Sequence, residues 1–364
     1  MAIVQSAITI FIFLFMLGAL VVIHELGHFV VARLAGIRVL EFGIGFPPRA
    51  KVLRSEGETL YTLNWLPIGG FVRLEGEDGD SEDPRAFGRA PLVTRLIVLL
   101  AGVTMNVVLA FAIFAAISWV PGSAWGLTIG AIQPNSPAAA AGLASGDTLV
   151  AIDGQRYDQF DGPDPMLNQL RGDAGKSVNL TIVSAGGQTR DITTTLRPPS
   201  QVNAQNGALG GYNLVFGPSA LDYVRSPVDA VTTGAHRTAD AFQLIASGLG
   251  SIANSIATKP TQAPPAQGPV GIAVVVGNVF WQSGPIATLY LAGLLSANLA
   301  LVNILPFPPL DGGRMAVMLI KSVAGKRISL QAERLTYLVG FGFLFAFLIW
   351  ITYFDIARIG GAAQ

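Results

Sequence analysis

Four long stretches of this chain carry almost no charge, and this feature limits its possible folds more than any other. They cover residues 4–35, 92–120, 286–305 and 335–353. Each reaches the length of about 20 residues that a helix needs to cross the hydrocarbon core of a bilayer. Because 51% of the residues are hydrophobic and only 13% are charged, a water-exposed surface could not be covered with charge. The sequence predicts a membrane protein, mainly α-helical, with four transmembrane helices.

A cleaved signal peptide is the alternative interpretation of the first stretch. Such peptides begin with positive charge and end at a small-residue cleavage site. No lysine or arginine precedes His24. We therefore expect the first stretch to remain in the protein as a spanning helix.

The basic residues of the connecting stretches predict the orientation in the membrane. They are concentrated at 33–95 and at 314–334, between the first and second and between the third and fourth apolar stretches. Lysine and arginine close to the ends of spanning helices remain cytoplasmic. Both chain ends and the long connection between the second and third stretches are therefore expected on the opposite side.

The ionisable residues exclude several kinds of chemistry. The 23 lysines and arginines balance the 23 aspartates and glutamates, so nothing favours a nucleic-acid partner. The chain has no cysteine, which excludes thiolate metal sites and a cysteine nucleophile. Its three histidines are His24, His28 and His236. A metal site must therefore use these side chains and carboxylates.

Outside the apolar stretches, the pattern predicts a small sheet, a β-rich domain and one more helix. Residues 42–75 alternate short strand-like runs with turns, which predicts an antiparallel sheet on the cytoplasmic side, associated with the membrane. The β-rich domain has strands expected at 127–132, 148–152 and 177–182 and short helices at 137–143 and 165–171. The predicted division of the chain is 1–121, 122–198, 199–280 and 281–364.

The third of these regions is expected to begin as a linker and to continue as an amphipathic helix. Glycine, asparagine and proline are frequent at 196–212, which indicates a linker. Apolar residues at 228, 231, 235 and 239 then recur at helical spacing over 227–256. This helix is expected to lie on the membrane or to pack on another part of the protein through that face.

The first apolar stretch contains the sequence His24-Glu25-Leu26-Gly27-His28. On a helix, residues four apart lie one turn apart on one face, so both imidazoles can reach one zinc ion. Glu25 is then close enough to act as a general base. Ionisable residues within an apolar spanning segment are costly and usually mark function. A polar helix end just outside the bilayer is the alternative.

A catalytic zinc ion has three protein ligands and one open position. His236 lies beyond the membrane in the predicted orientation and is a poor third ligand. Asp311 directly follows the third apolar stretch, on the cytoplasmic side with the His24–His28 pair, and is the best candidate. Prolines precede it at 306, 308 and 309, and such irregular backbone is tolerated at membrane depth only where protein or a polar cavity surrounds it. A helix cap is the alternative role.

The chain resembles the site-2 protease family of intramembrane metalloproteases, and most closely its bacterial regulator-of-sigma-E protease branch. The resemblance rests on HExxH in the first apolar stretch and on NxxPxPxLDG from Asn303 to Gly312. Further matches are Gly69-Gly70-Phe71-Val72, Ala101-Gly102 with Asn106, and Gly268-Pro269-Val270-Gly271-Ile272. Ser136-Pro137-Ala138, Ala141-Gly142-Leu143 and Gly146-Asp147 resemble a circularly permuted PDZ domain. Val103 follows Gly102 where the family often has proline, and only one PDZ-like unit is present.

The resemblance implies a function and a set of site residues. It implies a zinc protease that cuts single-span membrane proteins, such as anti-sigma factors or signal-peptide remnants, with zinc held by His24, His28 and Asp311 and Glu25 as the base. It assigns substrate binding to Asn303 and Asn106. It implies a bacterial inner-membrane protein with its active site toward the cytoplasm and a periplasmic α/β PDZ domain. The sheet at 42–74 is expected to hold the substrate as an added strand.

The PDZ groove is expected at Gly126, Leu127 and Ile129, beside the short helix at 137–143, with a C-terminal peptide as a possible ligand. Two other functions remain open. A metal transporter would need several sites along a path, whereas the sequence offers one cluster. A non-catalytic PDZ-bearing scaffold would have lost Glu25 or a ligand, whereas all are present.

Overall fold

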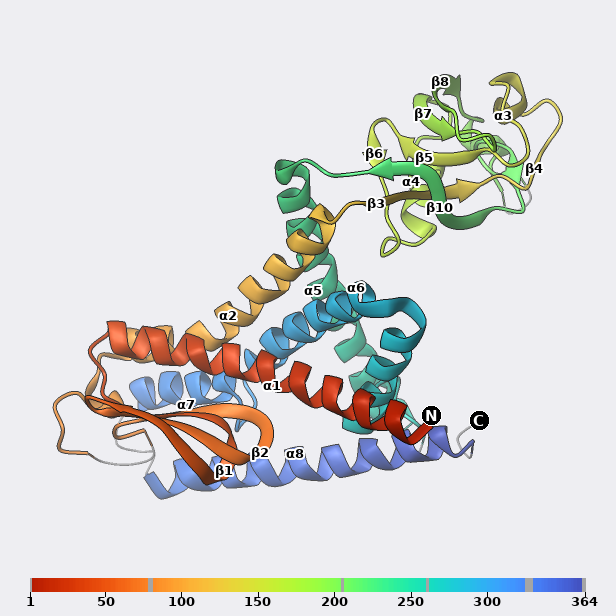
Figure 1. The fold of residues 1–364 in the computed structure, drawn as a ribbon. Coiled ribbons are helices and arrows are strands. Elements are labelled where there is room, and N and C mark those ends of the chain that lie inside the picture. The colour runs from red at the N-terminus through yellow and green to blue at the C-terminus, as the bar shows by residue number, and fades with distance from the viewer. Residues whose placement is uncertain (1, 78–80, 204–205, 260–261, 325–329, 362–364) are drawn as a thin grey trace. The chain divides into compact units, whose positions relative to one another are not determined.

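A computed structural model describes residues 2–77, 81–203, 206–259, 262–324 and 330–361. The chain forms two compact units. The first combines Met1–Ser118 with Val228–Gln364, and the second is Trp119–Pro227. Figure 1 shows the fold of each unit.

Among the described residues, four helices of the first unit are long and apolar enough to cross a membrane, which confirms the number predicted. They are α1 (Ala2–Leu34), α2 (Leu92–Trp119), α6 (Pro269–Asn303) and α8 (Leu330–Ile359). Large apolar side chains such as Phe11, Phe15 and Leu338 are more than two-thirds exposed along α1 and α8. Such surfaces suit a lipid environment.

Helix α6 begins earlier than the predicted span, which started at residue 286. Gly284 interrupts the helix with a φ of 81°, and Pro285 follows it. Proline lacks the amide hydrogen that a continuous helix needs at this position. The chain therefore bends there and continues as a helix on both sides.

The predicted sheet forms from β1 (Val39–Glu56) and β2 (Thr59–Leu74), two antiparallel strands that each fold back on themselves. Residues 41–44 pair with 60–63 on one side and with 70–73 on the other. Residues 59–64 also pair with 49–56, so the segment 70–74 forms one edge of the sheet. The sheet lies beside α1 (Figure 1). At this edge, a Cβ at Gly70 would lie 3.2 Å from Cγ2 of Val22.

Helix α5 (Pro227–Thr258) confirms the predicted helix, but its predicted apolar face packs only in part, where Phe242 and Ile245 lie against the core around Phe114. Its buried residues are Ala230, Gly234, Arg237, Thr238 and Ala241. A Cβ at Gly234 would lie 2.8 Å from Ala115 of α2, whereas Val228 and Val231 of the predicted apolar face are exposed. Small side chains let two helix backbones approach closely, and this favours the small-residue face over the bulkier one.

The second unit is built on a sheet in the order β10-β3-β5-β7-β8, with β6 paired to β5. Its strands are β3 (Gly122–Thr128), β5 (Thr148–Ile152), β6 (Gln155–Arg156), β7 (Ser177–Val183), β8 (Thr189–Thr195) and β10 (Val215–Tyr223). Helices α3 (Pro137–Ala140) and α4 (Asp164–Gly172) confirm the two short helices expected, and β4 (Ala131–Ile132) pairs with β9 (Gly211–Tyr212). Its core includes Leu149, Met166 and Leu180.

The structure differs from the expectation that residues 196–212 are only a linker. Leu196, Ala208 and Leu209 are buried in the core of the second unit, and β9 lies within this stretch. Strand β10 then returns to pair with β3. These pairings join residues far apart in the chain, so a local count of glycine and proline did not reveal them.

Helices α6 and α8 are joined by one buried carboxylate. Asp355 of α8 accepts hydrogen bonds from the backbone N–H groups of Gly268, at 3.1 Å, and Gly271, at 2.7 Å. The first N–H groups of a helix have no partner within the helix and carry partial positive charge. Arg358 supports the same segment by donating to the carbonyl of Ala266 at 2.7 Å. Asp355 therefore caps α6 from a neighbouring helix.

We predict that Asp355→Ala lowers the stability of the protein in detergent by about 2 kcal/mol or more, because two buried N–H groups lose their acceptor. Asp355→Asn keeps one acceptor oxygen, so its stability should lie between those of the wild type and Asp355→Ala. Thermal unfolding of the purified variants measures the effect. Tyr353→Phe, at a site 67% exposed on the same helix, is the matched control. Equal stability of Asp355→Ala and the wild type would contradict this role.

Candidate metal centre

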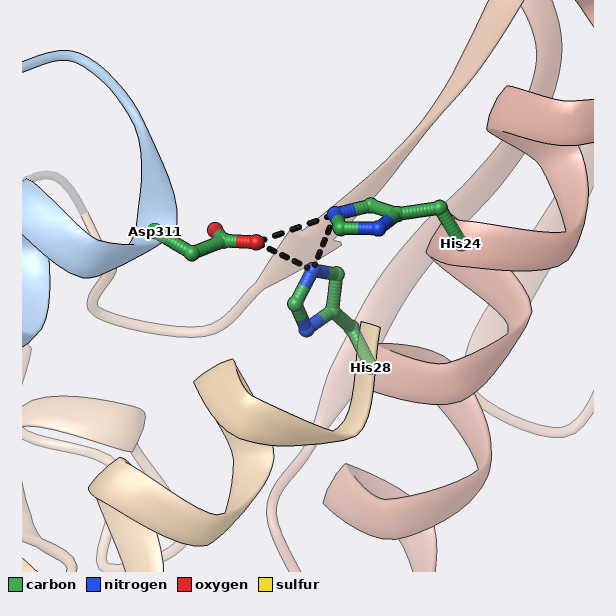
Figure 2. A group of neighbouring side chains, drawn as sticks. All are labelled: His24, His28 and Asp311. Carbon is green, nitrogen blue, oxygen red and sulfur yellow. Dashed lines mark hydrogen bonds and ion pairs between the residues drawn. The ribbon is translucent and has the colours of Figure 1, made fainter. Parts of the chain in front are cut away.

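Three metal-ligating side chains from distant parts of the chain meet in the first unit. His24 and His28 project from one face of α1, and Asp311 is the first residue of α7 (Asp311–Ala324). The Nε2 atoms of the two histidines are 3.2 Å apart. Asp311 Oδ2 lies 2.9 Å from Nε2 of His24 and 3.3 Å from Nε2 of His28, as Figure 2 shows. Among the described residues this is the group that could hold a metal ion.

The spacing of these atoms fits a zinc ion. Zinc binds imidazole nitrogen and carboxylate oxygen at about 2.0–2.2 Å in tetrahedral geometry, which places neighbouring ligand atoms about 3.3–3.6 Å apart. The three separations in the structure lie within about half an ångström of that spacing. Both histidines are buried, and the three donors supply the N and O ligands that zinc accepts. The residues present therefore fit the group.

A tight turn between α6 and α7 brings Asp311 to the two histidines. After Asn303 the chain reverses direction through short-range hydrogen bonds, such as Phe307 N–H to the carbonyl of Leu305 at 2.7 Å. Gly312 and Gly313 then lie directly against this backbone. A Cβ at Gly312 would lie 2.1 Å from the Ile304 carbonyl oxygen, and one at Gly313 would lie 2.5 Å from the Phe307 carbonyl. The glycines after Asp311 thus let the turn close.

Helix α2 holds the other ring nitrogen of each histidine. His28 Nδ1 lies 2.8 Å from the backbone carbonyl oxygen of Val98. His24 Nδ1 lies 3.0 Å from Nδ2 of Asn106. These contacts orient the two rings so that both Nε2 atoms face Asp311. Outer partners of this kind usually fix ring orientation at metal sites.

Glu25 lies next to the sheet instead of joining the three ligands. Its Oε2 accepts a hydrogen bond from the backbone N–H of Val72 at 3.2 Å. Val72 belongs to the edge segment of β2, so the Glu25 carboxylate contacts a strand edge. The structure thus places a candidate base beside one edge of the sheet.

The other predicted site residues lie in different surroundings. Asn303 ends α6 and is half-buried, whereas His236 is exposed on α5. Asn106 is fully buried against His24. A direct contact between Asn106 and a substrate conflicts with this burial.

The predicted peptide groove of the second unit also conflicts with the structure. Leu127 and Ile129 belong to the hydrophobic core, at 2% and 1% exposure. Strand β3 pairs with β10 on one side and β5 on the other, and a Cβ at Gly126 would lie 2.1 Å from the Leu149 carbonyl. Strand addition needs an open edge. The pattern that indicated a groove is the pattern of a buried strand.

One ion pair near the site was not found by sequence reasoning. Arg314 Nη1, one turn after Asp311 on α7, lies 2.6 Å from Oε1 of Glu77, in the loop after β2. Burial would lower the pKa of the Arg314 guanidinium, but the adjacent Glu77 carboxylate outweighs burial and raises it above its ordinary value. The pair ties α7 to the sheet. No local pattern signals it, because its members lie 237 residues apart.

The chain is similar to known proteins over almost its whole length. The profile of peptidase family M50 matches residues 12–347. A relative from Clostridium perfringens with zinc metalloprotease in its name is 32% identical over 93% of this chain and 96% of its own length. Zinc metalloprotease RasP of Geobacillus kaustophilus is 28% identical, over 98% and 99%. Regulator of sigma-W protease RasP of Bacillus subtilis is 26% identical, over 96% and 99%.

The chain belongs to peptidase family M50, the site-2 protease family. This membership confirms the family resemblance and the prediction that the chain is a metalloprotease. A PDZ domain of an SdrC-like protein from Listeria innocua matches 28% of this chain and 97% of its own length, at 18% identity and a TM-score of 0.19. A TM-score this low does not establish the fold of the second unit, so its assignment as a PDZ domain stays a prediction.

We predict that Gly102→Ala disrupts the site, because the added Cβ would lie 2.4 Å from His28 Nε2 and 2.8 Å from His24 Cε1. Metal affinity should fall by about tenfold or more, as for other disturbances of the groups that orient metal ligands. Metal content and a chelator titration of the purified variant measure this. Gly342→Ala is the matched control, since a Cβ at Gly342 on α8 would meet no atom within 4 Å. A Gly102→Ala protein with normal metal affinity would refute the close approach.

Proposed function

We propose that this protein is a zinc protease that cuts membrane-spanning proteins within or beside the bilayer. The observation that carries the proposal is the triangle of His24, His28 and Asp311, in which both histidines are buried, with Glu25 beside it on an apolar helix. The relatives named zinc metalloprotease support the identity of the metal. When bound here, zinc would supply a water nucleophile that is ionised near neutral pH.

The residues of this chain then have separate roles. His24, His28 and Asp311 would hold the ion. Glu25 would accept the proton of the attacking water and pass it to the leaving amine, which is the ordinary work of a general base and acid. The carboxylate now accepts the N–H of Val72, so it already lies beside the strand edge.

The edge segment 70–74 offers a place for the substrate. A helix hides its carbonyl groups in its own hydrogen bonds, so a spanning substrate must become extended before it can be cut. Pairing with this edge would keep the substrate extended next to Glu25, once the substrate replaces the contacts that the N–H groups of Val72 and Leu74 now make to Glu25 and Glu77. Asn303, half-buried at the end of α6, would bind the substrate backbone.

The proposed substrates are single-span membrane proteins, such as anti-sigma factors or signal-peptide remnants. The name of the Bacillus subtilis relative, regulator of sigma-W protease, supports this class. The second unit would act as a PDZ domain that limits access or binds a C-terminal peptide, at an edge other than β3.

Two other functions find less support. A scaffold that had lost activity would lack part of the site, whereas Glu25 and all three ligands are present. A transporter would need a path of metal sites, and the described residues offer one such group.

We predict that Glu25→Gln binds zinc normally and loses cleavage by at least about 100-fold, because glutamine cannot accept the proton. Asp311→Asn should lose both metal and activity. His236→Ala, which changes an exposed residue of α5, should keep both and serves as the control. Metal analysis of each purified protein and cleavage of a tagged single-span substrate give the two readouts. Near-normal cleavage by Glu25→Gln would rule out this mechanism.

We propose that the protein lies in the bacterial inner membrane, with its metal centre toward the cytoplasm and its second unit on the opposite side of the membrane. The basic residues at 33–95 and 314–334 support this orientation. Because the chain has no cysteine, single reporter cysteines can test it.

We predict that cysteines at Ser81 and Ser322 are protected from a membrane-impermeant thiol reagent in spheroplasts, and that a cysteine at Ser200 reacts. All three should react once the membrane is dissolved in detergent, which controls for burial. Labelling of Ser81 together with protection of Ser200 would invert the orientation.

A further inference from the structure

Three residues of α2, spaced four apart, face the two histidines. Val98, Gly102 and Asn106 lie on successive turns of one helix face, because residues at this spacing lie above one another. All three are buried. His24 and His28 have the same spacing on α1. The two helices therefore meet turn against turn, and each turn of α2 makes a different contact.

Two of these contacts have a clear role. The Val98 carbonyl oxygen lies 2.8 Å from His28 Nδ1 and can only accept a hydrogen bond. That contact places the proton of His28 on Nδ1 and leaves Nε2 free to bind a metal. Gly102 leaves the space that both rings occupy.

The third contact is chemically incomplete as it stands. Asn106 is 0% exposed, and its Nδ2 lies 3.0 Å from His24 Nδ1. Its Oδ1 has no hydrogen-bond partner within the described part of the chain. A buried amide oxygen without a partner costs about 1–3 kcal/mol. The contact also favours the wrong tautomer for metal binding. If Nδ2 donates to Nδ1, a neutral His24 carries its proton on Nε2, the nitrogen that would bind the metal.

A half-turn of the Asn106 amide resolves the second of these points, the position of the His24 proton. Oxygen and nitrogen of a primary amide exchange places with little change of shape. Oδ1 would then accept the Nδ1–H of His24, and Nε2 would be free for the metal, as in His28. The helix itself need not move, since Ser296 of α6 holds the Asn106 backbone carbonyl by a hydrogen bond of 2.8 Å.

We propose that Asn106 is a positioning residue for the metal centre, and that its side-chain oxygen accepts the Nδ1–H of His24 and holds that ring in the orientation and tautomer that bind the metal. The role matches that of the Val98 carbonyl for His28. This inference rests on the proposed function, because it requires a metal held by His24, His28 and Asp311. It replaces the substrate-binding role that the family resemblance assigned to Asn106.

Zinc affinity of the full-length protein in detergent tests the proposal. Asn106→Leu has a similar volume but no acceptor, so its Kd for zinc should rise by about 10- to 100-fold. Asn106→Asp retains an acceptor but cannot donate when ionised, so its Kd should stay at or below the wild-type value. The visible spectrum of the cobalt-substituted protein should change in Asn106→Leu and not in Asn106→Asp. Asn303→Leu is the matched control: it should lower cleavage while leaving the Kd unchanged.

The possible failures can be told apart. If the His24→Ala protein holds as much zinc as the wild type, the proposed function itself is wrong. Normal zinc binding by the wild type together with an unchanged Kd in Asn106→Leu would overturn the inference alone. Equal loss in Asn106→Leu and Asn106→Asp would exclude the acceptor role. Unfolding of the metal-free proteins shows whether Asn106→Leu folds, and Asn106→Ala replaces it if it does not.

Discussion

The first unit depends on the burial of two imidazoles and a carboxylate between apolar helices. Polar groups in such surroundings are costly unless each one has a partner. The Nε2 atoms and Asp311 satisfy one another, and α2 satisfies Nδ1 of both rings. Helix α2 must therefore approach α1 to within hydrogen-bonding distance. Gly27 allows this, since a Cβ there would lie 2.4 Å from the Ala101 carbonyl.

The same constraint explains the irregular parts of the chain around the site. Asp311 reaches the histidines only because a proline-rich turn and two glycines reverse the chain directly after α6. Arg314 then anchors α7 to the loop after β2 through Glu77. Glu25 contacts the edge of the same sheet. The ligand cluster, the candidate base and the strand edge are thus held together by a few polar contacts.

Farther from the site, the helices associate through small residues and polar caps. Lipid chains are as apolar as leucine, so apolar bulk alone does not drive spanning helices together. Gly234 brings α5 against Ala115 of α2, and Gly293 of α6 packs on Phe114. Asp355 joins α8 to the start of α6. Close backbone contact and satisfied N–H groups provide the association that hydrophobicity cannot.

The sequence by itself determined the features that rest on local spacing and composition. Four stretches with almost no charge predicted the four long helices, and HExxH placed two ligands and Glu25 on one helix. The motif around Asp311 supplied the third ligand, although only the resemblance and the predicted orientation connected it to the first two. These signals are readable because a spanning helix and a pair of residues one turn apart are properties of short segments.

Only the tertiary structure decided which neighbours each residue meets. It placed Asn106 against His24 and Leu127 in a hydrophobic core, where the sequence had suggested binding surfaces for both. It placed part of a predicted linker in strand β9 and in a hydrophobic core, buried the small residues of α5 against α2, and paired Arg314 with Glu77. The physical reason is common to all of these. A side chain's role depends on contacts between segments distant in the chain, and local periodicity records which face is apolar but not what that face packs against.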